Sequence, residues 1–258
     1  MKDCVAPIFR CACPDLPGKP INLPNIMLGL GIGLRFFACL DIIQSVLGGK
    51  QTCFQYEVPF SLDLCNRMQG YRSYQSIQGI PDQFIMFFAW VNSLCETPGA
   101  SDSPGLVAWV EEILPQIKLT GGESGDPLLR FGRIAVQECW RFAAYIYLYM
   151  VLCRVDAYDP RVVEAQKGIM RLVNGIKPAR YPDAFLAPMI IAAVATFKES
   201  DRNTIRQRFL GVRECSERGT MMNECVLGLE DIWERTKIEG RPAVWSDLRI
   251  ALRRVTGK

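Results

Sequence analysis

The sequence predicts an all-α fold, and three observations lead to that prediction. Apolar residues recur at spacings of three and four along most of the chain, which is the period of one face of an α-helix. No segment alternates apolar and polar residues for long enough to predict a β-strand. Proline, glycine and capping residues divide the chain into pieces of helix length. We therefore expect a multi-helix array of roughly eight to ten antiparallel helices.

The N-terminal segment differs from the rest of the chain in its proline content. Proline fixes φ and removes a hydrogen-bond donor, so closely spaced prolines disfavour regular structure. The prolines of this segment are Pro7, Pro14, Pro17, Pro20 and Pro24. We expect residues 1–24 to form an extended or disordered lead-in and residues 25–258 to form the folded domain.

Capping residues and prolines mark most of the expected helix starts. Polar caps accept hydrogen bonds from the first N–H groups of a helix, and proline is tolerated there because its missing donor is not needed. Such signals stand at Ser61, Pro81, Asp159-Pro160, Tyr181-Pro182-Asp183, Ser200-Asp201, Asn223 and Trp245-Ser246-Asp247. Further helices are expected over residues 25–47, ended by Gly48-Gly49, and over residues 106–117, bent or ended near Pro115.

Residues 127–155 give the strongest helix prediction of the chain. From Trp140 onward almost every side of this helix is apolar, which is typical of a helix surrounded by others. The uncharged runs over residues 142–153 and 185–197 are too short to span a bilayer, since a transmembrane helix needs about 20 apolar residues. We expect buried core helices and no membrane segment.

The composition excludes several function classes. The net charge of +3 is too small for a general polyanion binder. The chain has no histidine, which rules out Ser-His-Asp and Cys-His catalysis within it. Helical enzymes that use metal-bound carboxylates need acidic clusters such as D-D-x-x-D, and the sequence has none. We expect the protein not to be an enzyme.

Two local patterns, one of glycines and one of cysteines, suggest a cofactor site and a metal site, and the spacing of the residues argues against both. Residues 29–33 read G-x-G-x-G, whereas a dinucleotide fingerprint needs G-x-G-x-x-G between a strand and a helix. Cys4, Cys11 and Cys13 are the only clustered thiols among 11 cysteines, and they lack the C-x2-C spacing of zinc sites. We expect no cofactor, no metal, and reduced thiols in cytosol or nucleus.

The long apolar helix also carries the candidate ligand site. Trp140, Tyr145 and Tyr147 combine apolar surface with polar tips, which suits a pocket for a small molecule. The alternative is that the same side chains pack in the core, which apolar stripes at helical spacing favour. The C-terminal helix is basic, and it could either contact phosphate or form a solvated face. Its cations are Arg249, Arg253, Arg254 and Lys258.

The order of several motifs resembles a known family, the fungal-specific transcription factor domain. Residues 34–45 (LRFFACLDIIQS) resemble its R-F-F-x-x-x-D-I-x-x-S helix, and an aromatic loop (CFQY, residues 53–56) follows. Residues 79–82 (GIPD) are similar to its G-x-P helix start. Residues 140–148 (WRFAAYIYL) are similar to its W-x-x-A-x-x-x-Y-L motif.

The downstream order is also similar to the family. Residues 201–209 (DRNTIRQRF) resemble a D/E-x-R-x-x-I/V-x-x-R-F/L helix. A W-E motif at Trp233-Glu234 and a W-x-D segment at residues 245–248 close the series. The resemblance covers roughly residues 26–254, and it identifies residues 25–258 as a regulatory domain of zinc-cluster-type fungal regulators.

The resemblance implies an all-helical, nuclear, often dimeric domain that controls transcription, in some cases in response to metabolites. It transfers no catalytic residue, and the zinc cluster of the family is not recognisable here, so no autonomous DNA binding is expected. We therefore expect a regulatory domain that acts through a homodimer or other transcription regulators. The alternative is a stand-alone or truncated helical module that binds a small molecule, in the cytoplasm if truncated.

Overall fold

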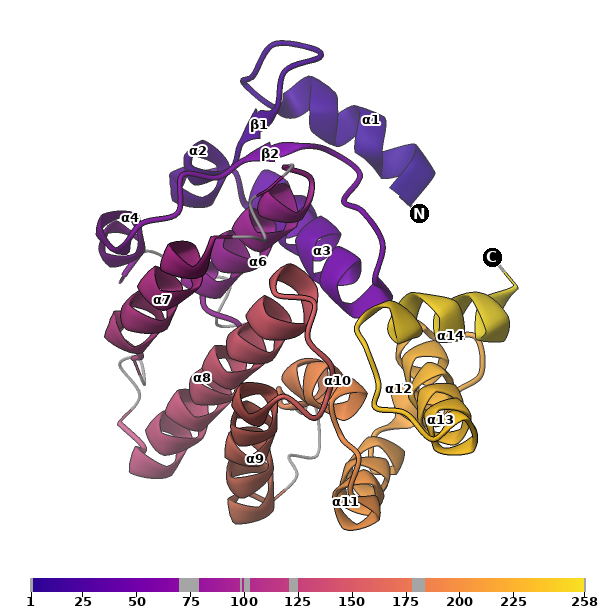
Figure 1. Ribbon diagram of the computed structural model, residues 1–258. Coiled ribbons are helices and arrows are strands. Elements are labelled where there is room, and N and C mark those ends of the chain that lie inside the picture. The colour runs from indigo at the N-terminus through magenta and orange to yellow at the C-terminus, as the bar shows by residue number, and fades with distance from the viewer. Residues whose placement is uncertain are drawn as a thin grey trace. The chain divides into compact units, whose positions relative to one another are not determined.

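The computed structural model describes residues 2–69, 79–97, 99, 103–120, 125–177 and 184–257, without the side chains of residues 2–4 and of Pro104 (Figure 1). Over these residues the all-α prediction is confirmed, with 13 helices and almost no strand. The antiparallel arrangement stays a prediction. The chain divides into two compact units, which we call unit 1 (Met1–Val46 and Lys50–Lys118) and unit 2 (Leu47–Gly49 and Leu119–Lys258).

Unit 1 is built from helices and one small strand pair. Its elements are α1 (Lys2–Ala12), β1 (Ile21–Asn22), α2 (Leu23–Leu28), α3 (Ile32–Gly48, whose last residues belong to unit 2), β2 (Tyr56–Glu57), α4 (Leu62–Arg67), α6 (Asp82–Cys95), α7 (Pro104–Ile113) and the short 3-10 helix η2 (Leu114–Gln116). The strands pair in parallel, with Ile21 opposite Tyr56. Sequence reasoning missed them, because two residues give no alternation to detect.

Unit 2 contains the longest helices of the described chain. Its elements are α8 (Pro127–Tyr147), the π-helical segment η3 (Leu148–Leu152), α9 (Pro160–Gly175), α10 (Leu186–Val194), α11 (Glu199–Leu210), α12 (Arg213–Ser216), α13 (Met221–Glu239) and α14 (Ser246–Thr256). The described helices outnumber the roughly eight to ten that we expected. The excess comes from short helices such as α2, α4 and α12, which are too short to show a periodic stripe.

The N-terminal segment corrects one expectation. In place of an extended or disordered lead-in, it holds helix α1, with Pro7 inside it, and the strand β1. Phe9 of α1 is buried and stacks on Phe37 with ring centroids 4.2 Å apart. Leu23 is fully buried as well. Apolar contacts therefore outweigh the local effect of the prolines, and the segment is part of the unit 1 core.

Two polar residues of the R-F-F motif helix hold unit 1 together. Arg35 on α3 pairs with Asp82 at the start of α6, with Nη2 2.8 Å from Oδ2, and both side chains are buried. Asp41, also buried, accepts hydrogen bonds from the Cys53 N–H at 2.9 Å and from the Tyr56 hydroxyl at 3.0 Å. Burial raises the pKa of the Tyr56 phenol, and Asp41 adds to that effect. The motif residues thus connect helices and loops that are distant in sequence.

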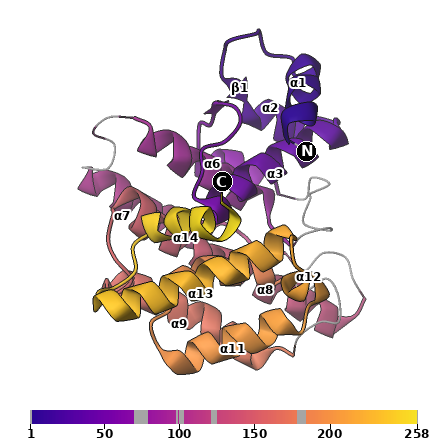
Figure 2. The same cartoon turned by 90° about the vertical axis from the view of Figure 1, so that its right-hand side faces the viewer.

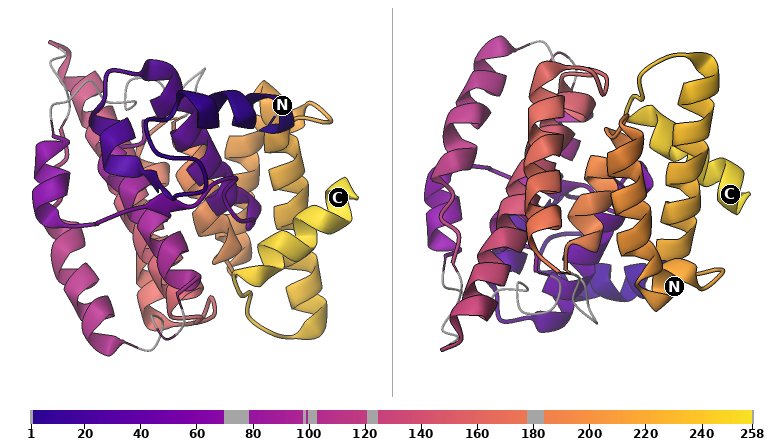
Figure 3. Two further views of the ribbon diagram at one scale, coloured as in Figure 1. Left: turned by 90° about the horizontal axis from the view of Figure 1, so that it is seen from above. Right: turned by 90° about the horizontal axis from the view of Figure 1, so that it is seen from below.

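Helix α8 and its continuation form the centre of unit 2. Its C-terminal half is buried on nearly all sides, as the apolar sequence predicts, and α9 and α10 pack on it (Figures 1 and 3). The expected single helix over residues 127–155 ends differently, because the backbone widens to a π-helix at Leu148–Leu152. Arg154 then adopts φ 54°, a left-handed conformation that stops the helix.

The remaining helices of unit 2 gather around α13. Figure 2 shows α14 and α11 running beside α13. The Trp233 indole N–H on α13 donates to the Ala193 carbonyl of α10 at 2.9 Å. On α11, the guanidinium of Arg208 donates to the carbonyl of Val173, in the last turn of α9, and to that of Ile176, directly after α9. The Arg208 bonds satisfy carbonyls at the end of α9, where a helix leaves its last carbonyls without intrahelical partners.

Several predicted helix starts agree with the structure, and others differ. Side chains of Ser61 and Asp159 cap α4 and α9 as expected. Helix α11 begins at Glu199 rather than at Ser200-Asp201. Helix α13 begins at Met221, with Thr220 as its cap, rather than at Asn223. The helix predicted over residues 25–47 is split, since α2 ends at Leu28 and α3 begins at Ile32, with the glycine-rich residues 29–31 between them. The predicted start at residues 181–183 lies outside the described residues.

The contact between α8 and α9 gives a first testable prediction. A Cβ added to Gly168 would lie 2.6 Å from the ring of Phe142 on α8, so an alanine there has to displace the ring. We expect Gly168→Ala to lower the free energy of unfolding by about 1–3 kcal/mol. Gly132 in α8 is the matched control, because a Cβ there meets no atom within 4 Å.

Gly132→Ala should leave stability unchanged or raise it by up to about 1 kcal/mol, because alanine favours helix more than glycine does. Urea unfolding followed by circular dichroism measures both variants. Equal stability of the two variants would show that Gly168 is not required for the close approach of α8 and α9.

Candidate functional site

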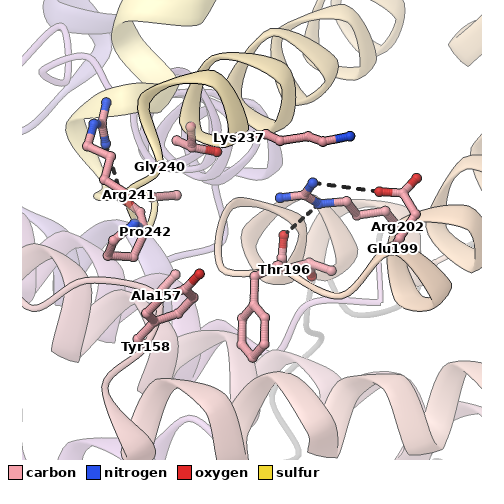
Figure 4. Close-up of a pocket in the computed structure, with 12 residues that line it drawn as sticks. Ala157, Tyr158, Thr196, Glu199, Arg202, Lys237, Gly240, Arg241 and Pro242 are labelled. Carbon is pink, nitrogen blue, oxygen red and sulfur yellow. Dashed lines mark hydrogen bonds and ion pairs between the residues drawn. The ribbon is translucent and has the colours of Figure 1, made fainter.

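A cavity of about 420 Å³ lies in unit 2 and is the candidate binding site (Figure 4). Three regions form it: the segment before α9, the segment between α10 and α11 with the first turn of α11, and the last turn of α13 with the segment after it. Its lining residues are Ala157, Tyr158, Thr196, Phe197, Glu199, Arg202, Thr236, Lys237, Gly240, Arg241, Pro242 and Ala243. The volume falls in the range of about 300–1,000 Å³ that is typical of small-molecule sites.

The first wall depends on how the central helix ends. The left-handed turn at Arg154 sends the chain out of the core, and the Asp156 carboxylate then accepts from the Tyr158 N–H at 2.8 Å. The Ala157 N–H donates to the Ala243 carbonyl at 2.9 Å. This backbone bond ties the segment before α9 to the segment after α13, so two walls of the cavity are held together.

The second wall is the C-terminus of α13. Gly240 ends the helix with φ 65°, and the N–H groups of Gly240 and Arg241 donate back to Lys237 and Thr236. This pair of bonds is the Schellman arrangement, which uses glycine because the left-handed conformation is strained for other residues. The turn places Lys237 and Pro242 on the rim of the same cavity.

A buried carboxylate fixes the loop between α13 and α14. Asp247, which is 1% exposed, accepts from the guanidinium groups of Arg235 at 2.6 Å and Arg241 at 2.8 Å, and from the Val244 N–H at 2.9 Å. Burial alone would raise the pKa of this carboxyl, and the hydrogen bonds outweigh it, so the pKa falls to about 2. Arg241 is thus neutralised by its ion pair with Asp247.

The third wall carries a buried cation. Arg202 is 9% exposed, its Nε donates to the Thr196 carbonyl at 3.1 Å, and its guanidinium lies over the Trp233 ring at 5.4 Å. Burial lowers the pKa of this guanidinium. The nearest carboxylate oxygen, on Glu199, is 3.7 Å from Nη1, which is beyond a normal hydrogen bond. Glu199 lies closer to Arg206, at 2.6 Å.

Two aromatic side chains line the outer part of the cavity. Tyr158 and Phe197 contact each other edge to face, with ring centroids 5.0 Å apart. They are 57% and 39% exposed, so part of each ring is open to the cavity or to solvent. The cavity therefore combines aromatic surface with cationic groups.

The residues that we predicted as a ligand pocket do not line this cavity. Trp140 and Tyr147 are buried, and Tyr147 packs edge to face on Trp245 at 5.1 Å. Tyr145 is half-buried and stacks on Tyr149. A pocket at Trp140, Tyr145 and Tyr147 stays a prediction. Sequence reasoning missed Tyr158, Phe197 and Lys237 because each stands alone beside a loop and has no pattern to mark it.

A second cavity, of about 460 Å³, lies within unit 1. Its charged lining residues are the carboxylates Glu57 and Glu96, and its other polar groups include Asn92 and Tyr56. Asn92 is itself bonded to the Ser45 hydroxyl at 3.2 Å, and Tyr56 is bonded to Asp41. The polar groups of this cavity thus serve the packing of unit 1.

The described residues hold neither a metal-binding cluster nor a helix that could cross a membrane. No cluster of three or more His, Cys, Asp or Glu side chains is placed there to hold a metal ion. Cys11 is exposed and Cys13 is buried, and the side chain of Cys4 lies outside the described set. None of the described helices is long and apolar enough to cross a membrane.

Comparison with known protein families shows to which family the chain belongs. The family model described as the fungal specific transcription factor domain matches residues 30–249. The chain belongs to this family. The resemblance drawn from the sequence motifs is confirmed, and family membership gives the chain a role in transcription regulation. No curated protein and no solved structure matches the chain.

In this fungal transcription factor domain, several motif residues have structural tasks. Arg35, Asp41 and Arg208 satisfy buried charges and helix-end carbonyls, and Asp247 of the W-x-D segment anchors a loop. Arg202, from the family-like segment 201–209, differs because it also lines the cavity. It is the one position where the motifs that we recognised and the cavity coincide among the described residues.

The Asp247 network gives the second testable prediction. We expect Asp247→Asn to lower the free energy of unfolding at neutral pH by about 3 kcal/mol, because it leaves Arg235 and Arg241 without their shared carboxylate. Asp231→Asn is the control, since Asp231 also pairs with Arg235, at 3.4 Å, but is less buried. Urea unfolding measures both variants.

The pH dependence provides a second readout of the same network. Because the folded-state pKa of Asp247 lies below its ordinary value of 3.8, the ionised carboxylate stabilises the fold above about pH 4, and that contribution is lost as the pH falls toward 2. Stability of the native chain should fall more steeply between pH 4 and 2 than that of Asp247→Asn. Parallel profiles would contradict the assignment.

Proposed function

We propose that this chain is a regulatory domain that acts in the nucleus, controls transcription through contacts with a second copy of itself, and has no enzymatic activity. The transcriptional role follows from the family. The nuclear location, the partner and the absence of catalysis are our proposal. The observation that carries the protein contact is a row of exposed apolar side chains on one helix.

That row lies on the N-terminal half of α8. Leu128 is 80% exposed and Phe131 is 62% exposed, and Leu129 and Ile134 beside them are exposed as well. Large apolar side chains that cluster on a surface mark protein interaction sites. Residues 128, 131 and 134 follow helical spacing, so they share one face that a second copy of the same helix could cover.

A size measurement tests the dimer. Light scattering coupled to gel filtration, at several protein concentrations, should show a dimer that dissociates on dilution. The double substitution Leu128→Ser with Phe131→Ser should shift the protein to monomer, because it removes apolar area from the interface. Leu210→Ser is the matched control, since Leu210 is similarly exposed on α11. A native chain that is monomeric at every concentration would refute the dimer.

A reporter assay tests the transcriptional role directly. The chain would be fused to an unrelated DNA-binding module and expressed in a fungal host with a reporter gene under that module's operator. We expect reporter output to differ from that of the module alone. Unchanged output, with the fusion protein present in the nucleus at the level of the module, would contradict the proposal.

Metabolite sensing is a second candidate function, and the cavity of unit 2 favours it. A ligand that binds only the native state raises stability, so thermal unfolding of the chain against a panel of metabolites should identify stabilising compounds. A compound that stabilises the chain and leaves the reporter unaffected would favour the alternative of a stand-alone binding module.

A further inference from the structure

We propose that the cavity of unit 2 binds a small organic anion, a carboxylate attached to a flat apolar group, with Arg202 and Lys237 contacting the charge and Tyr158 and Phe197 contacting the flat group. The inference specifies the ligand class for the sensing role above and so rests on it in part. Four features of the cavity support it.

The first feature is the incomplete pairing of Arg202. This guanidinium is nine-tenths buried, and a buried cation is costly unless charge and hydrogen bonds compensate it. Nε bonds to the Thr196 carbonyl, and Nη1 lies 3.7 Å from Glu199. Within the described part of the chain, Nη2 has no hydrogen-bond acceptor, and Figure 4 shows the end of the guanidinium directed into the cavity. A carboxylate would supply the missing acceptors.

The second feature is the net charge of the lining. Of its cations, Arg241 is held by Asp247 and Glu239, and Figure 4 shows it turned away from the cavity. Lys237 has no ion pair within 4.0 Å among the described residues, and it extends on the same side of the cavity as Arg202. Glu199 is the single acid of the lining, and it is shared with Arg206, so positive charge prevails.

The third feature is the aromatic surface on the opposite side. Tyr158 lies across the cavity from Arg202 and Lys237 (Figure 4), and it contacts Phe197 edge to face. Exposed aromatic rings favour flat apolar partners, since such contacts bury area and align ring edges with ring faces. The Tyr158 hydroxyl, which has no hydrogen-bond partner among the described residues, can donate to a second polar group of the ligand.

The fourth feature is size. The cavity of about 420 Å³ is far larger than an inorganic anion requires, because a water molecule occupies about 30 Å³ of liquid. An inorganic phosphate would contact the cations and leave the aromatic side empty. The combination of volume, separated charge and aromatic surface therefore favours an organic anion.

Binding to the purified 258-residue chain tests the proposal. The probes are benzoate, phenylacetate and phenylpyruvate, with benzamide and phenylacetamide as neutral counterparts and inorganic phosphate as the purely ionic one. Isothermal titration calorimetry should show binding of at least one carboxylate, and about tenfold or more weaker binding of its amide and of phosphate. Equal affinity of carboxylate and amide, or no binding of any carboxylate at millimolar concentration, would overturn the proposal.

Variants locate the site. Lys237→Gln should weaken carboxylate binding about tenfold, and Tyr158→Ala should weaken it by a similar factor through lost ring contact. Lys237 and Tyr158 are exposed, so these variants should fold even if Arg202→Gln, which removes a group packed on Trp233, does not. Arg213→Gln is the control, because Arg213 is an exposed cation of unit 2 outside the cavity. Unchanged affinity in both Lys237→Gln and Tyr158→Ala would place the ligand elsewhere.

The binding assay separates this inference from the sensing function. Calorimetry uses no transcription readout, so carboxylate binding with an unresponsive reporter would leave the site standing and refute the sensing role. A reporter that responds to carboxylates equally in the native chain and in Lys237→Gln would support the sensing role and refute the proposed binding site.

Discussion

The removal of one helix from water on nearly all sides is the constraint on which unit 2 depends. From Ala135 to Leu152 most side chains of α8 and η3 are buried, so other helices must cover each face of this segment. The close approach of α9 at Gly168 and the apolar sequence of α10 meet that need. A helix surrounded in this way cannot end inside the core without leaving carbonyls unsatisfied, because water is absent there. The widening at Leu148–Leu152 and the left-handed Arg154 are how the chain leaves the core, and they bring Tyr158 to the surface.

Buried charged side chains also connect helices and loops. Arg35 with Asp82, Asp41 with the Cys53 N–H, and Asp247 with two arginines each connect segments that are separated in sequence. Breaking any of these by removing one partner leaves an uncompensated charge in a poorly solvated place, which costs more than the intact pair contributes. Arg35, Asp41 and Asp247 are polar residues of the recognised motifs, and each bonds to a residue outside its own helix. The motifs therefore contain residues that connect the helices. They identify the family, and they indicate no catalytic residue.

The same reasoning explains which features could be predicted from the sequence. Long periodic segments such as α8 and α13 were predictable, since apolar spacing and caps act locally and agree with the tertiary structure. The helix α1 was missed because the five prolines of residues 1–24 outweigh the apolar residues in a local reading, whereas burial of Phe9 in the tertiary structure reverses that balance. The cavity was missed for a related reason. Tyr158, Arg202 and Lys237 are 35 or more residues apart in sequence, and only the packing of α11 and α13 beside the segment before α9 brings them together.

The location of the cavity also follows from packing. Trp140 and Tyr147 are buried in the core of unit 2, where side chains fill the space between helices. A ligand site needs volume that side chains leave unfilled, and helix ends provide it because their loops pack less densely than helix faces. Arg202 belongs to both environments, since its guanidinium lies over Trp233 of α13 and reaches the cavity from α11. Arg202 also contacts both α11 and α13, so an anion that binds its guanidinium would change the contact between these two helices. Ligand binding would therefore be coupled to the helix packing of unit 2.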